Sequence, residues 1–200
     1  MRGRILGLAI LVILSPSTAA ADWLLSPFVG FRFGAATTLI FVLEPPEGRA
    51  FTWGVSGGVL TDGVLGLEVD FSYVPGFFDA PLSASSRVIT LSGNAILTLP
   101  LSATTYGLRP YATGGLGLMH ASSRGVSSLG EILLVDSNFL AVNIGGGAIG
   151  PVSPRSSLRF DLRYFRNTRT DEDAVVRPGA AGAQLSFWRA SVGLTLRFRS

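Results

Sequence analysis

The stretch Leu65-Gly66-Leu67-Glu68-Val69-Asp70-Phe71-Ser72-Tyr73 alternates strictly between two kinds of residue. The odd-numbered positions are all apolar or aromatic, and the even-numbered positions are Gly, Glu, Asp and Ser. Successive side chains of a β-strand point to opposite faces, so this spacing places the apolar side chains on one face and the polar ones on the other. The stretch therefore predicts a strand that separates two different environments.

The same period of two recurs along the chain. Seven further segments show it: Pro27–Phe33, Phe51–Leu60, Ile89–Leu99, Ala112–His120, Leu140–Ala148, Leu158–Tyr164 and Trp188–Phe198. A tilted strand needs about 9–11 residues to cross a bilayer, and most of these segments approach that length. The sequence therefore predicts an all-β fold of eight strands.

The composition is apolar and poor in charge. Of the 200 residues, 14% are charged and 48% hydrophobic, whereas soluble domains average about 25% charged. The absence of Cys excludes a disulfide scaffold, a Cys-ligated metal and a Cys nucleophile. All 16 basic residues are Arg, and they form no basic stripe, so the formal charge of +3 does not predict nucleic-acid binding.

The N-terminus predicts export. Arg2 and Arg4 precede the apolar run Ile5–Leu14, and Ala19-Ala20-Ala21 offers a cleavage site. We therefore expect a cleaved signal over residues 1–21 and one domain over residues 22–200. No later apolar run is long enough for a spanning helix, which leaves a closed barrel as the way for the mature chain to cross a bilayer.

The direction of the two faces decides between a membrane barrel and a soluble one. The polar parity is rich in Gly and Ser, which suits a narrow lumen. We expect long connections at Ala35–Ala50, Pro75–Arg87, Ala121–Asn138 and Arg166–Gln184, and short ones at the opposite rim. Aromatic residues gather at the long-connection ends, as in an interfacial girdle: Phe33, Phe51, Trp53, Phe71, Tyr73, Tyr164 and Trp188.

These features predict an eight-stranded antiparallel up-and-down transmembrane β-barrel, with both termini at the short-turn, periplasmic rim. The alternative is a soluble, secreted lipocalin-like carrier, in which the same strands turn their apolar faces inward.

Three motifs resemble those of bacterial outer-membrane barrels. The segment Ser191–Phe198 is similar to their C-terminal insertion signal, carried here by Gly193, Leu196 and Phe198, although two residues follow the final aromatic. The stretches Pro27–Gly30 and Arg109–Gly117 resemble small OmpA/OmpX-like domains. The resemblance implies a porin-like location in a Gram-negative outer membrane, contact with its lipid, and recognition by the barrel-insertion machinery.

Charged residues on the polar parity face the predicted lumen: Arg32, Glu68, Asp70, Arg159, Asp161, Arg163, Arg189 and Arg197. An eight-stranded barrel is just wide enough for side chains to fill it, and buried charges are costly unless they pair. We therefore predict an internal ion-pair network that closes the lumen. The alternative is a gated ion path.

One group of residues raises the alternative of an enzyme. His120, Ser122 and Glu131 faintly resemble the His, Ser and Glu set of outer-membrane lipid A deacylases, with His as base, Ser as nucleophile and Glu as orienting acid. Ser123 departs from the Asn of that family, and the group follows the fifth predicted strand rather than lying near the C-terminus. We therefore predict that the protein is not an enzyme.

No metal-ligand cluster, nucleotide fingerprint or other cofactor motif is evident. The acidic run Asp171-Glu172-Asp173 suits a solvated loop tip, with a divalent cation as the alternative. The expected role is structural, adhesive or surface-interacting through the long loops.

Overall fold

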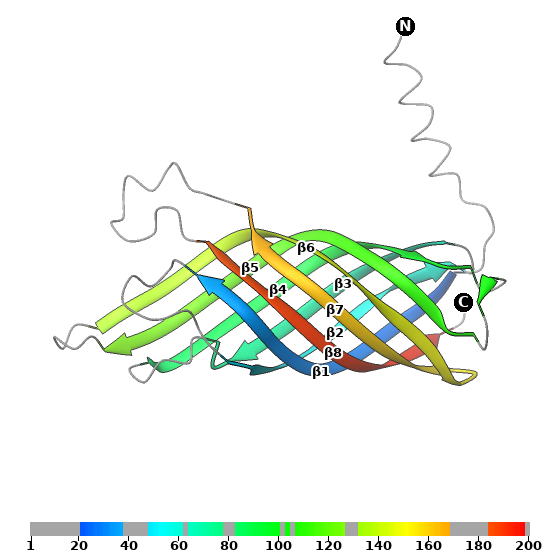
Figure 1. Ribbon diagram of the computed structural model, residues 1–200, viewed down its shortest axis with the longest axis horizontal. Coiled ribbons are helices and arrows are strands. Elements are labelled where there is room, and N and C mark those ends of the chain that lie inside the picture. Colours follow the sequence, from blue (N-terminus) through cyan, green and yellow to red (C-terminus); the bar gives the residue numbers. More distant parts are fainter. Residues whose placement is uncertain are drawn as a thin grey trace, which may run out of the picture.

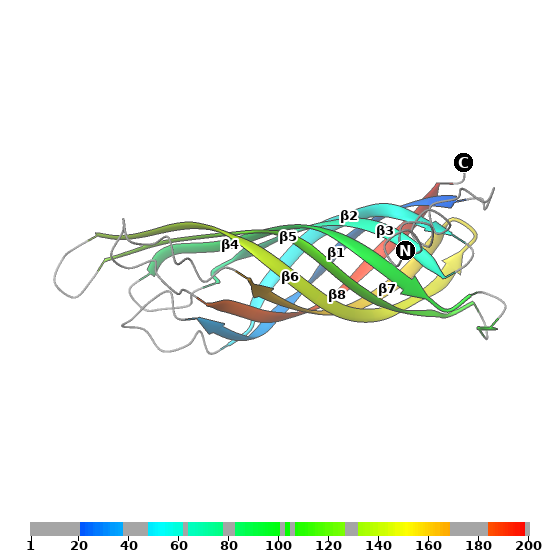
Figure 2. The same cartoon turned by 90° about the horizontal axis from the view of Figure 1, so that it is seen from above.

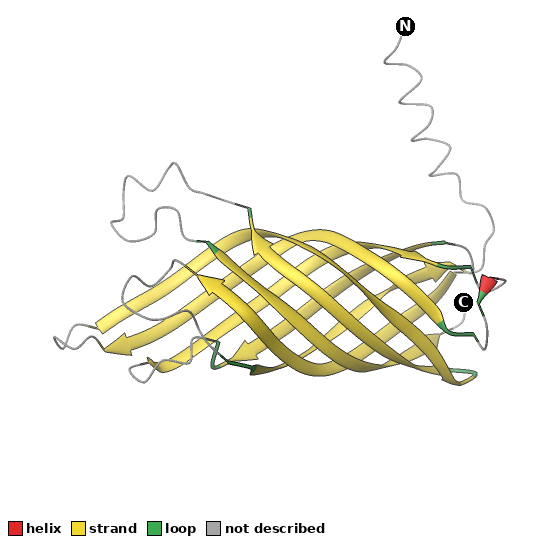
Figure 3. Cartoon of the chain, in the orientation of Figure 1, coloured by secondary structure: helices red, strands yellow, loops and turns green. Residues whose placement is uncertain are grey.

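A computed structural model describes residues 21–37, 48–61, 64–77, 83–100, 103–104, 107–126, 132–168 and 184–198. They form eight strands (Figures 1 and 3): β1 Ala21–Thr37, β2 Ala50–Thr61, β3 Leu65–Pro75, β4 Ser83–Thr98, β5 Arg109–Val126, β6 Ile132–Ser153, β7 Ser156–Asn167 and β8 Leu185–Phe198. Each strand pairs antiparallel with the next, and β8 pairs with β1 to close the barrel. The predicted fold is confirmed, and each predicted segment lies in a different strand, although β1, β5 and β6 run well beyond the segments predicted for them.

The closing seam runs almost the full length of β1 and β8. Its register extends from Trp23 opposite Phe198 to Thr37 opposite Leu185, with a shift between Phe33 and Ala36. The start of β1 pairs with the end of β8, so both of these strand ends lie at one rim of the barrel, which we call the turn rim (Figures 1 and 2). The opposite rim carries connections 38–49, 76–82, 127–131 and 168–184, and we call it the loop rim.

One predicted loop is wrong. The segment Ala121–Asn138, expected as a long connection, is mostly strand, because β5 continues to Val126 and β6 begins at Ile132. The backbone ladder continues through pairs such as Ser122 with Asp136. Backbone pairing does not require an apolar face, so the strands extend past the point where the period of two fades. At the turn rim, connection 99–108 is correspondingly longer than connection 127–131 at the loop rim.

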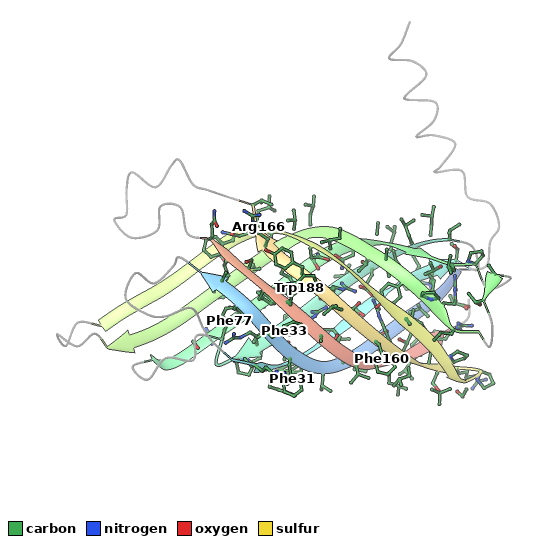
Figure 4. All side chains as sticks on the ribbon, in the orientation of Figure 1. Phe31, Phe33, Phe77, Phe160, Arg166 and Trp188 are labelled. Carbon is green, nitrogen blue, oxygen red and sulfur yellow. The ribbon has the colours of Figure 1, made fainter. Side chains whose placement is uncertain are left out.

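The apolar parity faces outward. In β3, Leu67 is 65% exposed and Val69 is 56% exposed, whereas Asp70, the residue after Val69, is 1% exposed. Figure 4 shows the same direction for Phe31, Phe160 and Trp188, which project from the outer surface. The soluble lipocalin-like alternative is therefore wrong, since that protein would bury these side chains and expose the carboxylates. Among the described residues, no helix is long and apolar enough to cross a membrane.

Candidate functional site

The lumen holds a central charged layer of six side chains: Glu68 and Asp70 on β3, Arg159, Asp161 and Arg163 on β7, and Arg189 on β8. Arg189 forms a bidentate salt bridge with Asp70, at 2.8 Å from Nη1 to Oδ1 and 3.0 Å from Nη2 to Oδ2. Arg163 reaches Glu68 Oε1 from Nη2 at 2.6 Å. Arg159 pairs with the other oxygen of Glu68 through Nη1. The layer therefore joins opposite walls of the barrel.

Alternation explains how these groups meet. Arg159, Asp161 and Arg163 occupy every second position of β7 and so share its inward face. Asp161 lies between the two arginines, with its Oδ1 2.8 Å from Arg163 Nε and its Oδ2 3.4 Å from Arg159 Nη2. The three guanidinium groups and three carboxylates of the layer balance in formal charge. Such balance is what allows charges to be buried in a narrow lumen.

Neutral and aromatic groups complete the layer. Tyr111 donates its hydroxyl hydrogen to Asp161 Oδ2 at 2.5 Å and accepts a hydrogen bond from Arg159 Nε at 2.8 Å. The guanidinium of Arg189 lies 4.5 Å from the ring centre of Phe28, within the range of a cation–π contact. The charged side chains therefore have both polar partners and aromatic packing.

Two of the eight residues predicted for one network lie outside this layer. Arg32 donates to the carbonyl oxygens of Phe77 and Gly48, and its guanidinium lies 4.7 Å from the Phe77 ring centre. Arg197 lies near the turn rim, where Nε is 3.3 Å from Asp22 Oδ2. The single network of eight is thus wrong in extent for Arg197, whereas Arg32 lies directly opposite Arg189 in the register of β1 and β8 and makes these contacts toward the loop rim.

Beyond the charged layer toward the loop rim, the inward residues become apolar. This loop-side apolar layer consists of Ala35, Ala50, Val74, Phe77, Val88, Met119, Ala121, Phe139, Ala141, Phe165, Leu185 and Phe187. Phe187 stacks on Phe165 with ring centres 5.1 Å apart and meets Phe77 edge-on at 5.2 Å. The described part of the lumen nearest the long connections is therefore filled mainly by packed hydrocarbon, with the Arg32 guanidinium against Phe77.

The turn-side end has its own apolar layer. Leu60, Ile96, Tyr111 and Ile149 form a buried cluster there, and Leu24 packs against it. Arg109 lies at the same end, donating to the Thr98 hydroxyl at 2.7 Å and to the Thr61 carbonyl at 3.3 Å. The charged layer is thus enclosed by apolar layers on both sides.

The sequence interpretation missed both apolar layers and Arg109, because it treated the inward parity as uniformly polar or small. A signal was present at the loop-side ends of four strands. Consecutive apolar residues occur there, as in Leu118-Met119, Phe139-Leu140, Tyr164-Phe165 and Phe187-Trp188. An apolar pair puts one side chain on each face of a strand, which indicates that the lumen at this level is apolar as well.

Little space remains between the layers. Two small cavities lie beside the charged residues, and Ser26 and Ser56 border both. Each has a volume of about 10 Å³, which is room for about one water molecule. Among the described residues, the inward side chains therefore leave little free space beside the charged layer.

The candidate catalytic residues are only partly within the described chain. His120 and Ser122 lie on the outer face of β5, two residues apart. His120 Nδ1 donates to Asn138 Oδ1 at 2.9 Å, across the pair of β5 with β6. Glu131 and the acidic run Asp171-Glu172-Asp173 lie outside the described residues. Within the described ranges, no group of His, Asp and Glu is placed to hold a metal ion.

The residues of the proposed insertion signal lie on β8 at the closing seam. Phe198 is exposed on the outer face opposite Trp23, and Leu196 lies opposite Leu25. Gly193 faces inward, where an added Cβ would lie 2.7 Å from the Pro27 carbonyl oxygen. The close approach of β1 and β8 thus explains why this position is glycine without any insertion signal. The role of Gly193 in insertion stays a prediction.

Comparison with known proteins agrees with this architecture. The family model described as "Outer membrane protein beta-barrel domain" matches residues 6–198. No curated protein matches the chain. Neisserial surface protein A (NspA) has a similar structure, with a TM-score of 0.61 and 16% identity, covering 89% of this chain and 99% of that one.

Two other solved barrels are similar. A major outer membrane protein of Thermus thermophilus has a TM-score of 0.56 and 16% identity, covering 90% of this chain and 100% of its own. Ail, the attachment invasion locus protein of Yersinia pestis, was solved in complex with the heparin analogue sucrose octasulfate. It has a TM-score of 0.55 and 11% identity, and the match covers 89% of this chain and 99% of Ail. At these identities the likeness concerns the fold, and the family match covers nearly the whole sequence. The chain therefore belongs to the outer membrane protein β-barrel domain family.

Proposed function

We propose that this protein is a closed barrel of the outer membrane whose role is structural or surface-interacting, exerted through the connections at its loop rim. The observation that carries this proposal is the filling of the lumen. A balanced charged layer lies between two apolar layers, and the cavities beside it have room for about one water molecule each. Transport through the barrel would require these packed layers to separate.

The arrangement also favours a non-conducting state over the alternative of a gated ion path. An ion crossing the loop-side apolar layer would lose its hydration among Phe77, Phe165 and Phe187. In the central layer it would compete with short ion pairs such as that of Arg189 with Asp70. Both barriers oppose conduction, so what remains available for interaction is the exterior.

The proposed orientation places the loop rim outside the cell and both termini in the periplasm. Strand order supports it, because β1 begins and β8 ends at the rim opposite connections 38–49 and 168–184. The proposal includes a cleaved signal over residues 1–21, a mature domain over residues 22–200, and recognition of Gly193, Leu196 and Phe198 by the insertion machinery. The Ail complex is a precedent for a ligand held by a barrel of similar fold.

A non-enzymatic role is proposed over lipid A deacylation. Support comes from the sequence, in which Ser123 departs from the Asn of that family and the group follows the fifth predicted strand rather than lying near the C-terminus. Mass spectrometry of lipid A from cells that express the protein tests this choice. We expect unchanged acyl chains, and loss of one acyl chain that requires His120 and Ser122 would establish the enzyme instead.

Two measurements test the proposed role itself. Purified protein in a planar bilayer should give no discrete current steps above those of a protein-free bilayer, and regular steps would refute the closed lumen. Cells that express the protein should adhere to heparin-coated plastic more than vector-only cells do. A variant with connections 38–49 and 168–184 replaced by short Gly-Ser turns should lose that gain, and full adhesion by the variant would refute display through these loops.

A further inference from the structure

At the loop rim, the outer face changes abruptly from apolar to basic or polar. On four strands and at the residue before β2, the outward position that follows the apolar and aromatic band toward the loop rim is Arg, His or Asn: Arg49 after Phe51, Arg87 after Ile89, His120 after Leu118, Asn138 after Leu140 and Arg166 after Tyr164. On β8 the corresponding position is Ser186, beyond Trp188. None of these positions carries a carboxylate.

The three arginines of this set, Arg49, Arg87 and Arg166, form what we call the cationic rim. All three are exposed. Within the described part of the chain, none of their side chains has a hydrogen bond or an ion pair. The lumen arginines differ, since Arg163 and Arg189 each pair with a carboxylate. The cationic rim therefore presents exposed positive charge, without a carboxylate partner among the described residues, to the surroundings of the barrel.

The level of the rim coincides with a reversal of polarity across the barrel wall. Inward neighbours at this level, such as Val88 beside Arg87 and Phe165 beside Arg166, belong to the loop-side apolar layer. A wall that is apolar inside and polar outside suits water rather than hydrocarbon. The lipid-facing band therefore ends at this level, and the cationic rim lies where headgroups begin.

Aromatic pairs mark the same boundary from the lipid side. The ring centres of Tyr164 and Trp188 are 5.1 Å apart, and Tyr164 is the outward residue next to Arg166 on the side away from the loop rim. The ring centres of Phe31 and Phe51 are 6.2 Å apart, and Phe51 stands in the same relation to Arg49. Figure 4 shows Trp188 and Arg166 in this order toward the loop rim. Aromatic rings favour the membrane–water interface, so the guanidinium groups lie at the depth of lipid phosphates.

We propose that the cationic rim binds phosphate groups of membrane lipid headgroups in the leaflet at the loop rim. A guanidinium donates two parallel hydrogen bonds to phosphate oxygens, which makes Arg well suited to this ligand. His120, held by Asn138 on the adjacent strand, adds a polar position between Arg87 and Arg166. This inference concerns the lipid around the barrel and stands whether or not the loops bind a surface ligand.

Lipid selectivity measured by electron spin resonance tests the proposal. The full-length protein is reconstituted in phosphatidylcholine vesicles with a trace of acyl-chain spin-labelled phosphatidic acid, phosphatidylcholine or stearic acid. The association of each labelled lipid with the barrel is then compared. We expect phosphatidic acid to be preferred over phosphatidylcholine by about fivefold, and over stearic acid as well, because stearate lacks phosphate.

The matched variants separate the rim from general charge. The triple variant Arg49→Gln, Arg87→Gln, Arg166→Gln should lower the preference for phosphatidic acid to nearly one. Arg155→Gln removes an exposed arginine from the turn between β6 and β7 at the opposite rim and should leave the preference intact. Heat-dependent gel mobility confirms that each variant is folded.

Three results would overturn the proposal: no preference in the unaltered protein, an undiminished preference in the triple variant, or equal preference for stearic acid. Equal loss with Arg155→Gln would also overturn it, because the preference would then reflect net charge. None of these results depends on adhesion or conductance, so failure here is distinguishable from failure of the proposed surface role.

Discussion

Replacing Asp70 by Asn should destabilise the barrel strongly. Asp70 and Arg189 are each 1% exposed, and two contacts of 2.8 and 3.0 Å join them. Asn preserves the size of the side chain but removes its charge, leaving Arg189 with its nearest carboxylate in Asp161, 3.7 Å from Nη2. Removing one partner of a buried ion pair costs about 3–5 kcal/mol, so we expect the free energy of unfolding to fall by about that amount.

The pair of Asp22 with Arg197 supplies the matched control. It joins the same residue types at 3.3 Å, but the Arg197 side chain is 36% exposed. Exposed pairs contribute about 0–1 kcal/mol, so Asp22→Asn should change stability by no more than that. The difference between the two variants isolates burial, because each substitution removes one carboxylate charge.

Equilibrium unfolding by urea in thin-bilayer vesicles, followed by Trp fluorescence and by heat-dependent gel mobility, measures both variants. The double variant Asp70→Asn, Arg189→Gln removes both charges and should be less destabilised than the sum of the two single variants, by about 2 kcal/mol or more. An Asp70→Asn variant within 1 kcal/mol of the unaltered protein, or no more destabilised than Asp22→Asn, would refute the buried charged layer as a stabilising element.

Three further substitutions address other layers and the closing seam. Asp161→Ala removes the partner 2.8 Å from Arg163 Nε and should lower the free energy of unfolding by about 3 kcal/mol, measured in the same urea assay; unchanged stability would contradict its pairing role. Phe187→Ala opens a cavity in the loop-side apolar layer and should cost about 3–5 kcal/mol; a loss below 1 kcal/mol would mean that the layer is loosely packed. Gly193→Val adds a Cβ only 2.7 Å from the Pro27 carbonyl oxygen and should reduce the heat-modifiable folded fraction on gels, whereas an unaltered fraction would show that the seam tolerates the added volume.

The alternation of side chains along a strand predicts which face each residue occupies, and it leaves contacts between strands undetermined. A period of two assigns side chains to faces, and it correctly separated Leu67 from Asp70. It does not say where along the lumen a side chain lies. Arg197 was therefore grouped with the charged layer although it pairs with Asp22 near the turn rim, and Arg32 was grouped with it although it donates to Phe77 and Gly48 toward the loop rim. The extension of β5 and β6 was missed for a related reason, since their outer pairs no longer separate lipid from lumen.

The sequence by itself determined the eight strands, their antiparallel order and the apolar character of one face, because side-chain alternation is a local property of each strand. Only the tertiary structure decided which charges meet. Glu68 contacts Arg159 and Arg163 because closure of the barrel brings β3 opposite β7, far away in sequence. Closure likewise gathers Phe77, Phe165 and Phe187 into one layer. The interior of a barrel depends on register and closure between strands, and no single strand contains that information.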